Sequence, residues 1–273
     1  MTADLRRTAL QWRALGRAAV VVEVVRTQGS VPRDAGTRLL VGNDAVVGTI
    51  GGGHLELRAI ADAHALLAGT AVARHQHITL GPTLGQCCGG ALDLSFTPLA
   101  EADPAAWPQP EALFSLQLYG AGHVGRAIVH LLAGLPCQVQ WIDERESEFP
   151  PETLPPHIQK VCVEPVFAEV AVAPPGAFVL VLTHSHDLDL AITQAVLQRG
   201  DFGFFGLIGS KTKRARFESR LRERGAADAL LAKMVCPIGM PGISGKAPEM
   251  IAVAVVAQLL QAAGAKKPGF DIA

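Results

Sequence analysis

The stretch Leu118-Tyr119-Gly120-Ala121-Gly122-His123-Val124-Gly125-Arg126-Ala127 decides the fold of the second half of this 273-residue chain. An apolar run precedes its glycines and a helical pattern follows them, which is the context of a dinucleotide-binding loop between strand and helix. Gly120 permits a tight turn, Gly122 lets a pyrophosphate approach the backbone, and Gly125 lets the helix pack on the strand. Asp143 ends the next predicted strand, 18 residues after Gly125, near the usual place of an acid that binds a ribose hydroxyl. The stretch predicts a Rossmann-like fold that holds a nucleotide-like ligand, or one whose site serves another ligand.

Downstream of this stretch, short apolar runs alternate with helical patterns, which is typical of a parallel sheet covered on both faces. The predicted strands are 114–120, 138–143, 160–164, 178–184, 203–209 and 234–239, with helices up to Ala133, over 188–198, after Ser210, and from Pro248 to Ala263. Residues 113–273 are therefore predicted to form a doubly wound α/β domain. Its last helix is so apolar that we expect it to be buried in this domain, against the first domain, or in a homodimer contact.

Upstream, the segment 101–112 has three prolines and several acids and no hydrophobic period, so it is predicted to be a linker. Before it, 18–27, 37–41, 72–80 and 91–96 have the pattern of strands, and 5–15 and 55–67 have helical spacing. Residues 1–100 are therefore predicted to form a smaller, separate α/β domain.

The composition excludes several classes of protein. The 24 Lys and Arg residues balance 25 Asp and Glu residues, whereas a nucleic-acid binder concentrates positive charge. Every apolar run is broken before the roughly 20 residues that a membrane span needs, and the first residues lack the apolar core of an export signal. We expect a cytoplasmic protein with neither a membrane nor a nucleic acid as partner, and its five cysteines, an odd number, point to reduced thiols.

Two loops of the first half are candidates for binding an anion. Gly51, Gly52 and Gly53 stand before a predicted helix that carries His54 and Glu56, and such a run can curl into a nest of amides that holds phosphate. Arg33, in a loop between strands, can supply the matching cation, or it can pair with Asp34 at the surface.

A third loop, 81–90, contains Gln86 and the adjacent pair Cys87-Cys88 between glycines. Adjacent cysteines lack the spacing of a structural zinc site. A nucleophilic thiolate, a persulfide carrier or a soft ligand to a sulfur-binding metal remain, and two small buried hydrophobic residues are the alternative. The other three cysteines, Cys137, Cys162 and Cys236, lie in or beside apolar strands and are predicted to be packing residues.

Polar residues also gather where predicted strands of the second domain end. His184, His186 and Asp187 can bind a metal or transfer protons, although Asp187 and Asp189 also suit the capping of a helix.

Ser210 and Lys211 follow the next strand and can complete an anion site at the same edge, whereas Arg214, Arg216 and Arg220 read as a solvated helix face. His75 and His77 alternate on a predicted strand and mark its solvent face.

These segments, in this order, resemble the XdhC/CoxI family. The likeness is carried by residues 29–41, 48–56, 80–90, 118–127, 141–150, 178–192, 206–217 and 236–260. It implies a protein that binds the molybdenum cofactor (molybdopterin), shields it from oxidation, supports its sulfuration with a cysteine desulfurase, and inserts it into xanthine dehydrogenase. The loop Met240-Pro241-Gly242 looks like the branch that serves a purine-oxidising client.

The resemblance gives the site residues roles as hypotheses. The run Gly51 to Gly53 or the Gly120 loop takes the cofactor phosphate, and Cys87 or Cys88 faces molybdenum or relays sulfur. A different reading is an NAD(P)-dependent oxidoreductase, with the nucleotide on the Gly120 loop and Asp143, and with His184 or His186 as acid–base catalyst. A third is a metal chaperone that uses His184, His186 and Asp187.

Overall fold

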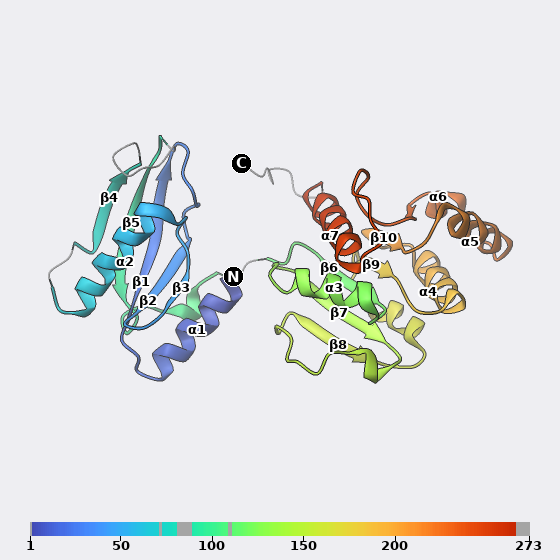
Figure 1. Cartoon of the computed structure of the whole chain (residues 1–273), viewed down its shortest axis with the longest axis horizontal. Coiled ribbons are helices and arrows are strands. Elements are labelled where there is room, and N and C mark those ends of the chain that lie inside the picture. The colour runs from blue at the N-terminus through green and yellow to red at the C-terminus, as the bar shows by residue number, and fades with distance from the viewer. Residues whose placement is uncertain (1, 71–72, 81–88, 109–110, 266–273) are drawn as a thin grey trace. The chain divides into compact units, whose positions relative to one another are not determined.

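The computed structural model of the chain describes residues 2–70, 73–80, 89–108 and 111–265. The chain divides into two compact units, residues 1–110 and 111–273, which are drawn in Figure 1.

The first unit is a five-stranded antiparallel sheet in the order β3-β2-β1-β5-β4, with two helices. Its elements are α1 (Thr2–Ala14), β1 (Ala19–Gln28), β2 (Arg38–Gly42), β3 (Val46–Gly48), α2 (Gly53–Leu67), β4 (His75–Thr79) and β5 (Ala91–Pro98). The predicted α/β class is confirmed, with four strands and both helices near their expected places. The short edge strand β3 was not predicted, because three residues carry too little pattern to be recognised.

Both faces of this sheet are covered, since β1 alternates its valines between them. Val20, Val22 and Val24 pack with the α2 residues Leu55 and Ala59. On the other face, Val21 and Leu40 pack with Leu5, Ala9 and Trp12 of α1.

The segment expected to be a linker belongs in part to this first unit. Leu99 and Ala102 are buried in the α1 core. The short helix η2 (Pro104–Ala106) accepts a hydrogen bond from Arg6 Nε at the carbonyl of Pro104, 3.0 Å away. Residues 101–106 are thus held to α1 by packing and hydrogen bonds rather than free to act as a connector.

The second unit is a six-stranded parallel sheet in the order β11-β10-β9-β6-β7-β8. Its strands are β6 (Ser115–Tyr119), β7 (Gln138–Asp143), β8 (Ile158–Cys162), β9 (Phe178–Val181), β10 (Phe204–Leu207) and β11 (Met234–Val235). Its helical segments are α3 (His123–Leu132), η3 (Glu146–Glu148), η4 (Val166–Val172), α4 (His186–Arg199), α5 (Lys211–Glu223), α6 (Asp228–Leu231) and α7 (Pro248–Gly264). This order confirms the predicted doubly wound sheet.

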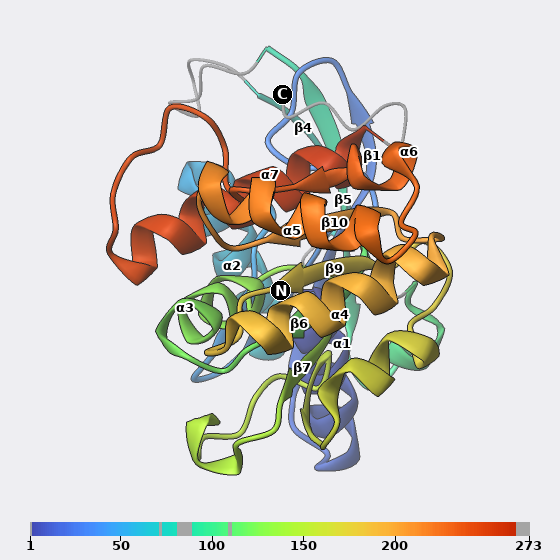
Figure 2. The same ribbon diagram turned by 90° about the vertical axis from the view of Figure 1, so that its right-hand side faces the viewer.

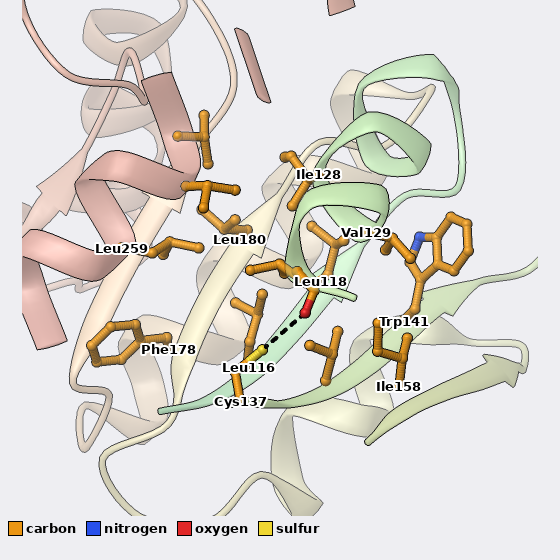
Figure 3. Close-up of a cluster of buried hydrophobic side chains, with 14 of the residues drawn as sticks. Leu116, Leu118, Ile128, Val129, Cys137, Trp141, Ile158, Phe178, Leu180 and Leu259 are labelled. Carbon is orange, nitrogen blue, oxygen red and sulfur yellow. Dashed lines mark hydrogen bonds between the residues drawn. The ribbon is translucent and has the colours of Figure 1, made fainter. Parts of the chain in front are cut away.

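Helices cover both faces of this sheet, as the nearly continuous apolar strands require. On one face, α3 and α7 pack on Leu118, Trp141 and Leu180 (Figure 3). On the other, α4 and α5 pack on Val181 and Phe205, and these two helices lie in front of the strands in Figure 2.

The C-terminal helix α7 packs inside the second unit. Ala252, Val255 and Leu259 are buried in the same core as α3. Of the three expected burial places, the structure therefore shows the first, the core of the second unit. Met250 and Val253 remain exposed on its outer side. No helix within the described ranges is long and apolar enough to cross a membrane.

Candidate functional site

The strand order of the second unit locates a ligand site. From β6 the chain continues to β7 and β8 on one side, then returns to β9 on the other side of β6. Open parallel sheets bind ligands where the order reverses, beyond the carboxyl ends of the strands. Here the loops after β6 and β9 meet that point, and they carry the predicted Gly120 loop and His184.

The three glycines of the Gly120 loop have three different surroundings. Gly120 has a φ of +117°, and a Cβ there would lie 2.3 Å from the carbonyl oxygen of Leu182. A Cβ on Gly125 would lie 2.1 Å from the carbonyl oxygen of Gly120. A Cβ on Gly122, in contrast, would meet nothing within 4 Å. Two glycines thus serve packing, and the third leaves the start of α3 open to a ligand.

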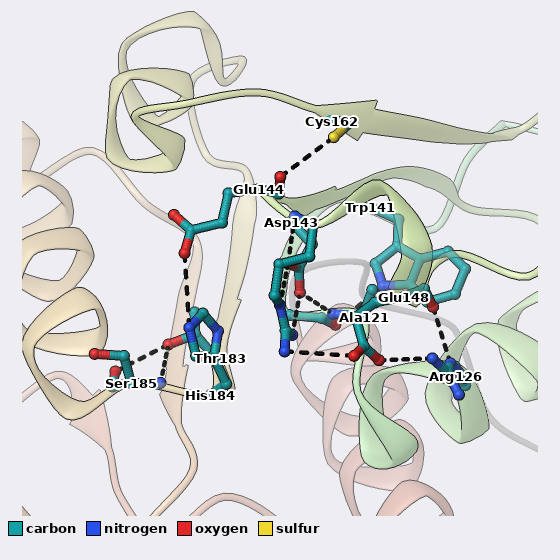
Figure 4. Close-up of polar contacts among 12 residues, drawn as sticks. Ala121, Arg126, Trp141, Asp143, Glu144, Glu148, Cys162, Thr183, His184 and Ser185 are labelled. Carbon is teal, nitrogen blue, oxygen red and sulfur yellow. Dashed lines mark hydrogen bonds and ion pairs between the residues drawn. The ribbon is translucent and has the colours of Figure 1, made fainter.

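Strand β7 holds this loop from its neighbouring position (Figure 4). Trp141 Nε1 donates to the carbonyl of Gly120 at 3.0 Å, and Asp143 Oδ2 accepts from the amide of Ala121 at 2.7 Å. Both carboxylate oxygens of Asp143 also accept from the Arg145 side chain, at 2.9 Å each, and Oδ1 accepts from the Arg145 amide.

Asp143 therefore does not fit its predicted role as a ribose ligand. Its side chain is buried and all four hydrogen bonds reach it from the chain itself. Burial alone would raise the pKa of Asp143, but the hydrogen bonds from Arg145 and Ala121 outweigh it and hold that pKa below its ordinary value. A ribose diol would have to displace Arg145 before it could bind Asp143. The contact with Asp143 that the NAD(P) oxidoreductase hypothesis requires is therefore not available in this structure.

A second contact crosses the end of β6. Glu144 follows β7, His184 follows β9, and Glu144 Oε1 lies 3.6 Å from His184 Nε2 (Figure 4). The His184 side chain is 41% exposed, and His186 and Asp187 are exposed at the start of α4. Within the described part of the chain, no three His, Cys, Asp or Glu side chains are grouped to hold a metal, so the metal-chaperone reading has no support from these residues.

A buried ion pair fixes two loops at the same edge, and the sequence did not predict it. Asp189, 1% exposed, lies 2.5 Å from Nζ of Lys213, 11% exposed. Asp189 Oδ1 accepts from the amide and hydroxyl of Thr183, and Lys213 Nζ donates to the carbonyl of Ile208. The pair therefore ties the turn before α4 to the turn before α5.

The predicted anion ligands Ser210 and Lys211 are placed differently from one another. The Ser210 hydroxyl accepts from the amide of Lys213 and so caps α5. Lys211 is exposed, and no carboxylate of the described residues pairs with it.

In the first unit, strand register brings the loop that carries Arg33, the Gly51 run and Gly90 to one end of the sheet. Gln28 pairs with Ala91, so the end of β1 lies beside the start of β5, and Leu39 pairs with Gly48. A Cβ on Gly90 would lie 2.4 Å from the carbonyl oxygen of Ser30, and one on Gly51 would lie 2.6 Å from Pro32 Cβ. These glycines allow the loops to touch.

The nest predicted at Gly51 to Gly53 is filled by the chain. Oε2 of Glu56 accepts from the amides of Ile50 and Gly52, at 2.9 and 3.1 Å, and from the hydroxyl of Thr49. The expected phosphate would have to expel this carboxylate. Glu56 was predicted to contact the bound ligand. In the structure its carboxylate instead takes the place in this loop that the anion was expected to take.

Arg33 and His54 are the exposed candidates that remain in this unit. Within the described residues Arg33 forms no ion pair with Asp34. The Arg33 side chain lies beside Gly51, whose Cβ would be 3.7 Å from Arg33 Cγ. Gln86, Cys87 and Cys88 lie outside the described residues, between Leu80 and Gly89.

Two of the three cysteines predicted to pack in the core do so. Cys137 and Cys236 are buried, and burial raises the pKa of Cys137 to about 12. Cys162 is exposed at the end of β8, and its Sγ lies 3.5 Å from the carbonyl oxygen of Glu144. The prediction for Cys162 is wrong because the last residue of a strand can leave the core while keeping its backbone pairing.

A cavity of about 190 Å³ lies away from these loops, at the amino ends of β6 and β7. Gln117 and Gln140 line it, and the Gln117 amide already bonds Gln140 and the carbonyl of Glu169. The side chains of these two glutamines are therefore already bonded within the chain.

The fold and the site define a protein with a Rossmann-type ligand-binding unit joined to a smaller α/β unit. A family model described as the XdhC Rossmann domain matches residues 116–259, and a model described as the XdhC and CoxI family matches residues 12–77. Because the first match alone covers more than half of the chain, this protein belongs to the XdhC and CoxI family.

One sequence relative and one solved structure extend the comparison. Uncharacterized protein YqeB of Escherichia coli (strain K12) is 30% identical over 249 residues, which are 88% of this chain and 43% of YqeB. The chain thus spans less than half the length of that relative. A crystal structure described as a xanthine dehydrogenase from Bacillus halodurans superposes on 99% of this chain and on 98% of that structure's chain, with a TM-score of 0.73 and 19% identity. At that identity the match shows a shared fold.

Proposed function

We propose that this protein binds the molybdenum cofactor and delivers it to a xanthine dehydrogenase, without independent turnover. The observation that carries the proposal is the match of both units to the XdhC and CoxI family. The open start of α3 at the switch point supplies a place for the ligand. The description of the Bacillus halodurans structure is consistent with this class of client.

The residues present fit the phosphate end of the cofactor better in the second unit than in the first. Molybdopterin ends in a phosphate, and the first amides of a helix together with its dipole favour such an anion. At the start of α3, a Cβ on Gly122 would meet nothing within 4 Å. At the start of α2, Glu56 already occupies the amides. We therefore assign the phosphate to Gly122 and His123, and not to Gly51 to Gly53.

The chain's other groups at the switch point orient the ligand. The turn from Thr183 to Ser185 lies beside the Gly120 loop, and its position is fixed by Asp189. His184 carries the exposed ring nitrogens of that turn and faces Glu144. When bound, the cofactor supplies redox-active molybdenum for the client enzyme.

For the sulfur chemistry we propose the pair Cys87 and Cys88, with Gln86 beside them. The anchors of their loop are described: the amide of Leu80 donates to the carbonyl of Gly90 at 2.8 Å. A soft thiolate suits molybdenum or a relayed persulfide, which makes a cysteine desulfurase the sulfur-donating partner. The loop Met240 to Gly242 favours a purine-oxidising client. A homodimer and a cytoplasmic location stay predictions.

The test is anaerobic isolation of the full chain, followed by assay of bound pterin and molybdenum and of activation of cofactor-free xanthine dehydrogenase. Gly122→Ala is expected to keep the fold and lose most bound pterin, since the new methyl group meets no protein atom but stands where the ligand approaches. Gly134→Ala is the matched control, because a Cβ there has only one neighbour, at 4.0 Å.

The two cysteines are tested by the double variant Cys87→Ala, Cys88→Ala. We expect it to retain pterin and to lose activation of the client. Full activation by this variant would contradict the sulfur role. Absence of pterin and molybdenum from the wild-type protein, with micromolar binding of NAD(P) by calorimetry, would contradict the proposed function itself.

A further inference from the structure

The charges of the second unit are strongly segregated along the chain. Residues 111–210 contain 11 acidic and four basic residues, whereas residues 211–246 contain nine basic and three acidic residues. The basic part consists of α5, α6 and the segments after them, which lie at the β10–β11 end of the sheet. A near-zero net charge therefore conceals a cationic region built around one helix.

Four of these cations already have partners within the chain. Arg214 pairs with Glu218 at 2.7 Å, and Arg222 pairs with Asp228 at 2.7 Å. Arg224 donates to the amide oxygen of Gln194, and Lys213 is buried against Asp189.

Three cations of α5 differ from these. Lys211, Arg216 and Arg220 are exposed, and none of them has an acidic or carbonyl partner among the described residues. Arg216 and Arg220 stand one helical turn apart on the same side, where like charges repel each other. Lys211, at the first position of the helix, lies on another side of α5. We call Arg216 and Arg220 the α5 cationic face. An anion that binds both arginines would relieve this repulsion.

The chemistry of the α5 cationic face selects the kind of anion. Among the described residues 211–233, no large hydrophobic side chain is exposed. The face therefore offers no aromatic ring to stack on bases and no apolar side chain to enter a lipid surface. Arginine forks match both carboxylates and phosphates in paired hydrogen bonds. Because the face lacks groups that stack on bases or enter a lipid surface, we take a protein surface rich in Asp and Glu as its partner, and nucleic acid and lipid are tested as alternatives.

The place of α5 connects this face to the candidate site. Helix α5 starts directly after β10, at the carboxyl edge of the sheet, and Lys213 ties its first turn to the turn that carries His184. In Figure 2, α5 lies in front of the strands. A protein bound along α5 is thus held beside the loops at which the cofactor is released.

We propose that the α5 cationic face docks a carboxylate-rich surface of the cofactor-free client enzyme. The inference rests on the proposed function, because it names the surface by which the same site meets its recipient. Charge pairs at the rim of an interface mainly speed association and lose strength in salt.

The experiment measures binding of the full-length protein to purified cofactor-free xanthine dehydrogenase in about 0.05 M and about 0.5 M salt, a range over which charge screening increases strongly. Arg216→Glu, Arg220→Glu is expected to weaken binding about tenfold in low salt, with a smaller difference in high salt. The control is Arg26→Glu, Arg58→Glu, which makes the same change of charge on exposed arginines of the first unit. The affinity of Arg216→Gln, Arg220→Gln for the client is expected to lie between those of the wild type and the Glu variant. Circular dichroism checks that each variant is folded.

Wild-type affinity in the Arg216→Glu, Arg220→Glu variant would overturn the proposal, as would equal weakening by the control. The proposal would also be overturned if this variant bound the client normally but lost another interaction. Such interactions are salt-sensitive self-association, RNA binding, or binding to anionic phospholipid vesicles. Bound pterin and molybdenum are measured in the same samples. A variant that retains the cofactor but no longer binds the client supports the docking surface. A wild-type protein that holds no cofactor contradicts the proposed function, but it does not contradict the docking surface.

Discussion

Replacing Asp189 by Asn should destabilise the second unit more than any other single change of a carboxylate to an amide. The substitution leaves the Lys213 ammonium, 11% exposed, without its counter-ion. Removing one partner of a buried pair costs about 3 to 5 kcal/mol. The slight exposure of Lys213 gives it some water, so we expect a value near the lower end, about 3 kcal/mol. That energy corresponds to a roughly 150-fold increase in the population of the opened unit.

Hydrogen exchange followed by mass spectrometry measures this opening in peptides from β9 and β10, and it reports on the second unit alone. Asp201→Asn is the matched control, because Asp201 forms an exposed pair with Arg199 that screening by water makes weak. The control should change exchange little.

The double variant Asp189→Asn, Lys213→Met distinguishes an ion pair from general packing. With both charges removed, no charge is left buried without a partner, and replacement of a buried pair by neutral groups is often tolerated. The double variant should therefore be more stable than Asp189→Asn alone. If the two single effects simply add, the reasoning is wrong, since additivity means that the two side chains do not interact.

Three more predictions concern the other polar groups. Glu56→Ala should lower the stability of the first unit by about 1 to 3 kcal/mol, because it leaves the amides of Ile50 and Gly52 without their acceptor; unchanged hydrogen exchange in peptides from α2 would contradict this. The lowered pKa of Asp143 means that its ionised form stabilises the second unit above the ordinary value of about 3.9, and that this contribution is lost as the pH falls through the folded pKa. Urea unfolding between about pH 5 and pH 2 should therefore show a smaller pH dependence in Asp143→Asn than in wild type. Cys162 should react with iodoacetamide before Cys137, since Cys162 is exposed whereas a pKa of about 12 leaves Cys137 almost wholly protonated; peptide mapping that finds Cys137 modified first would refute the burial argument.

The fold was predictable from the sequence because its signals are local and repeated. Each central strand of the second unit is a short apolar run followed by a helical pattern, and the Gly120 loop identifies the first strand–helix turn. Right-handed crossovers explain why the helices divide between the two faces, but the strand order itself was not predicted. The short strand β3 and the packed part of the predicted linker were missed, since both depend on contacts with α1 and β2 that no local pattern shows.

The candidate site was predictable in place but not in its contacts. The sequence brought His184 and Gly120 to one edge, because both follow parallel strands. It could not show that the hydrogen-bonding capacity of the Asp143 carboxylate is taken up by Arg145. Side chains two residues apart can point in different directions, so the sequence alone does not indicate that these two meet. It also missed the pair of Asp189 and Lys213, which are 24 residues apart and meet only when α4 and α5 cover the same face.

The two glycine runs show why such a motif does not by itself define a phosphate site. Each run precedes a helix and frees its first amides. The fourth residue of α2 is Glu56, which turns back and supplies the anion itself. The fourth residue of α3 is Arg126, whose guanidinium pairs outward with Glu148 at 2.6 Å. An arginine cannot accept hydrogen bonds from amides, so Arg126 leaves the first amides of α3 available to an external anion. We therefore propose that the charge of this fourth residue determines which of the two runs binds a phosphate.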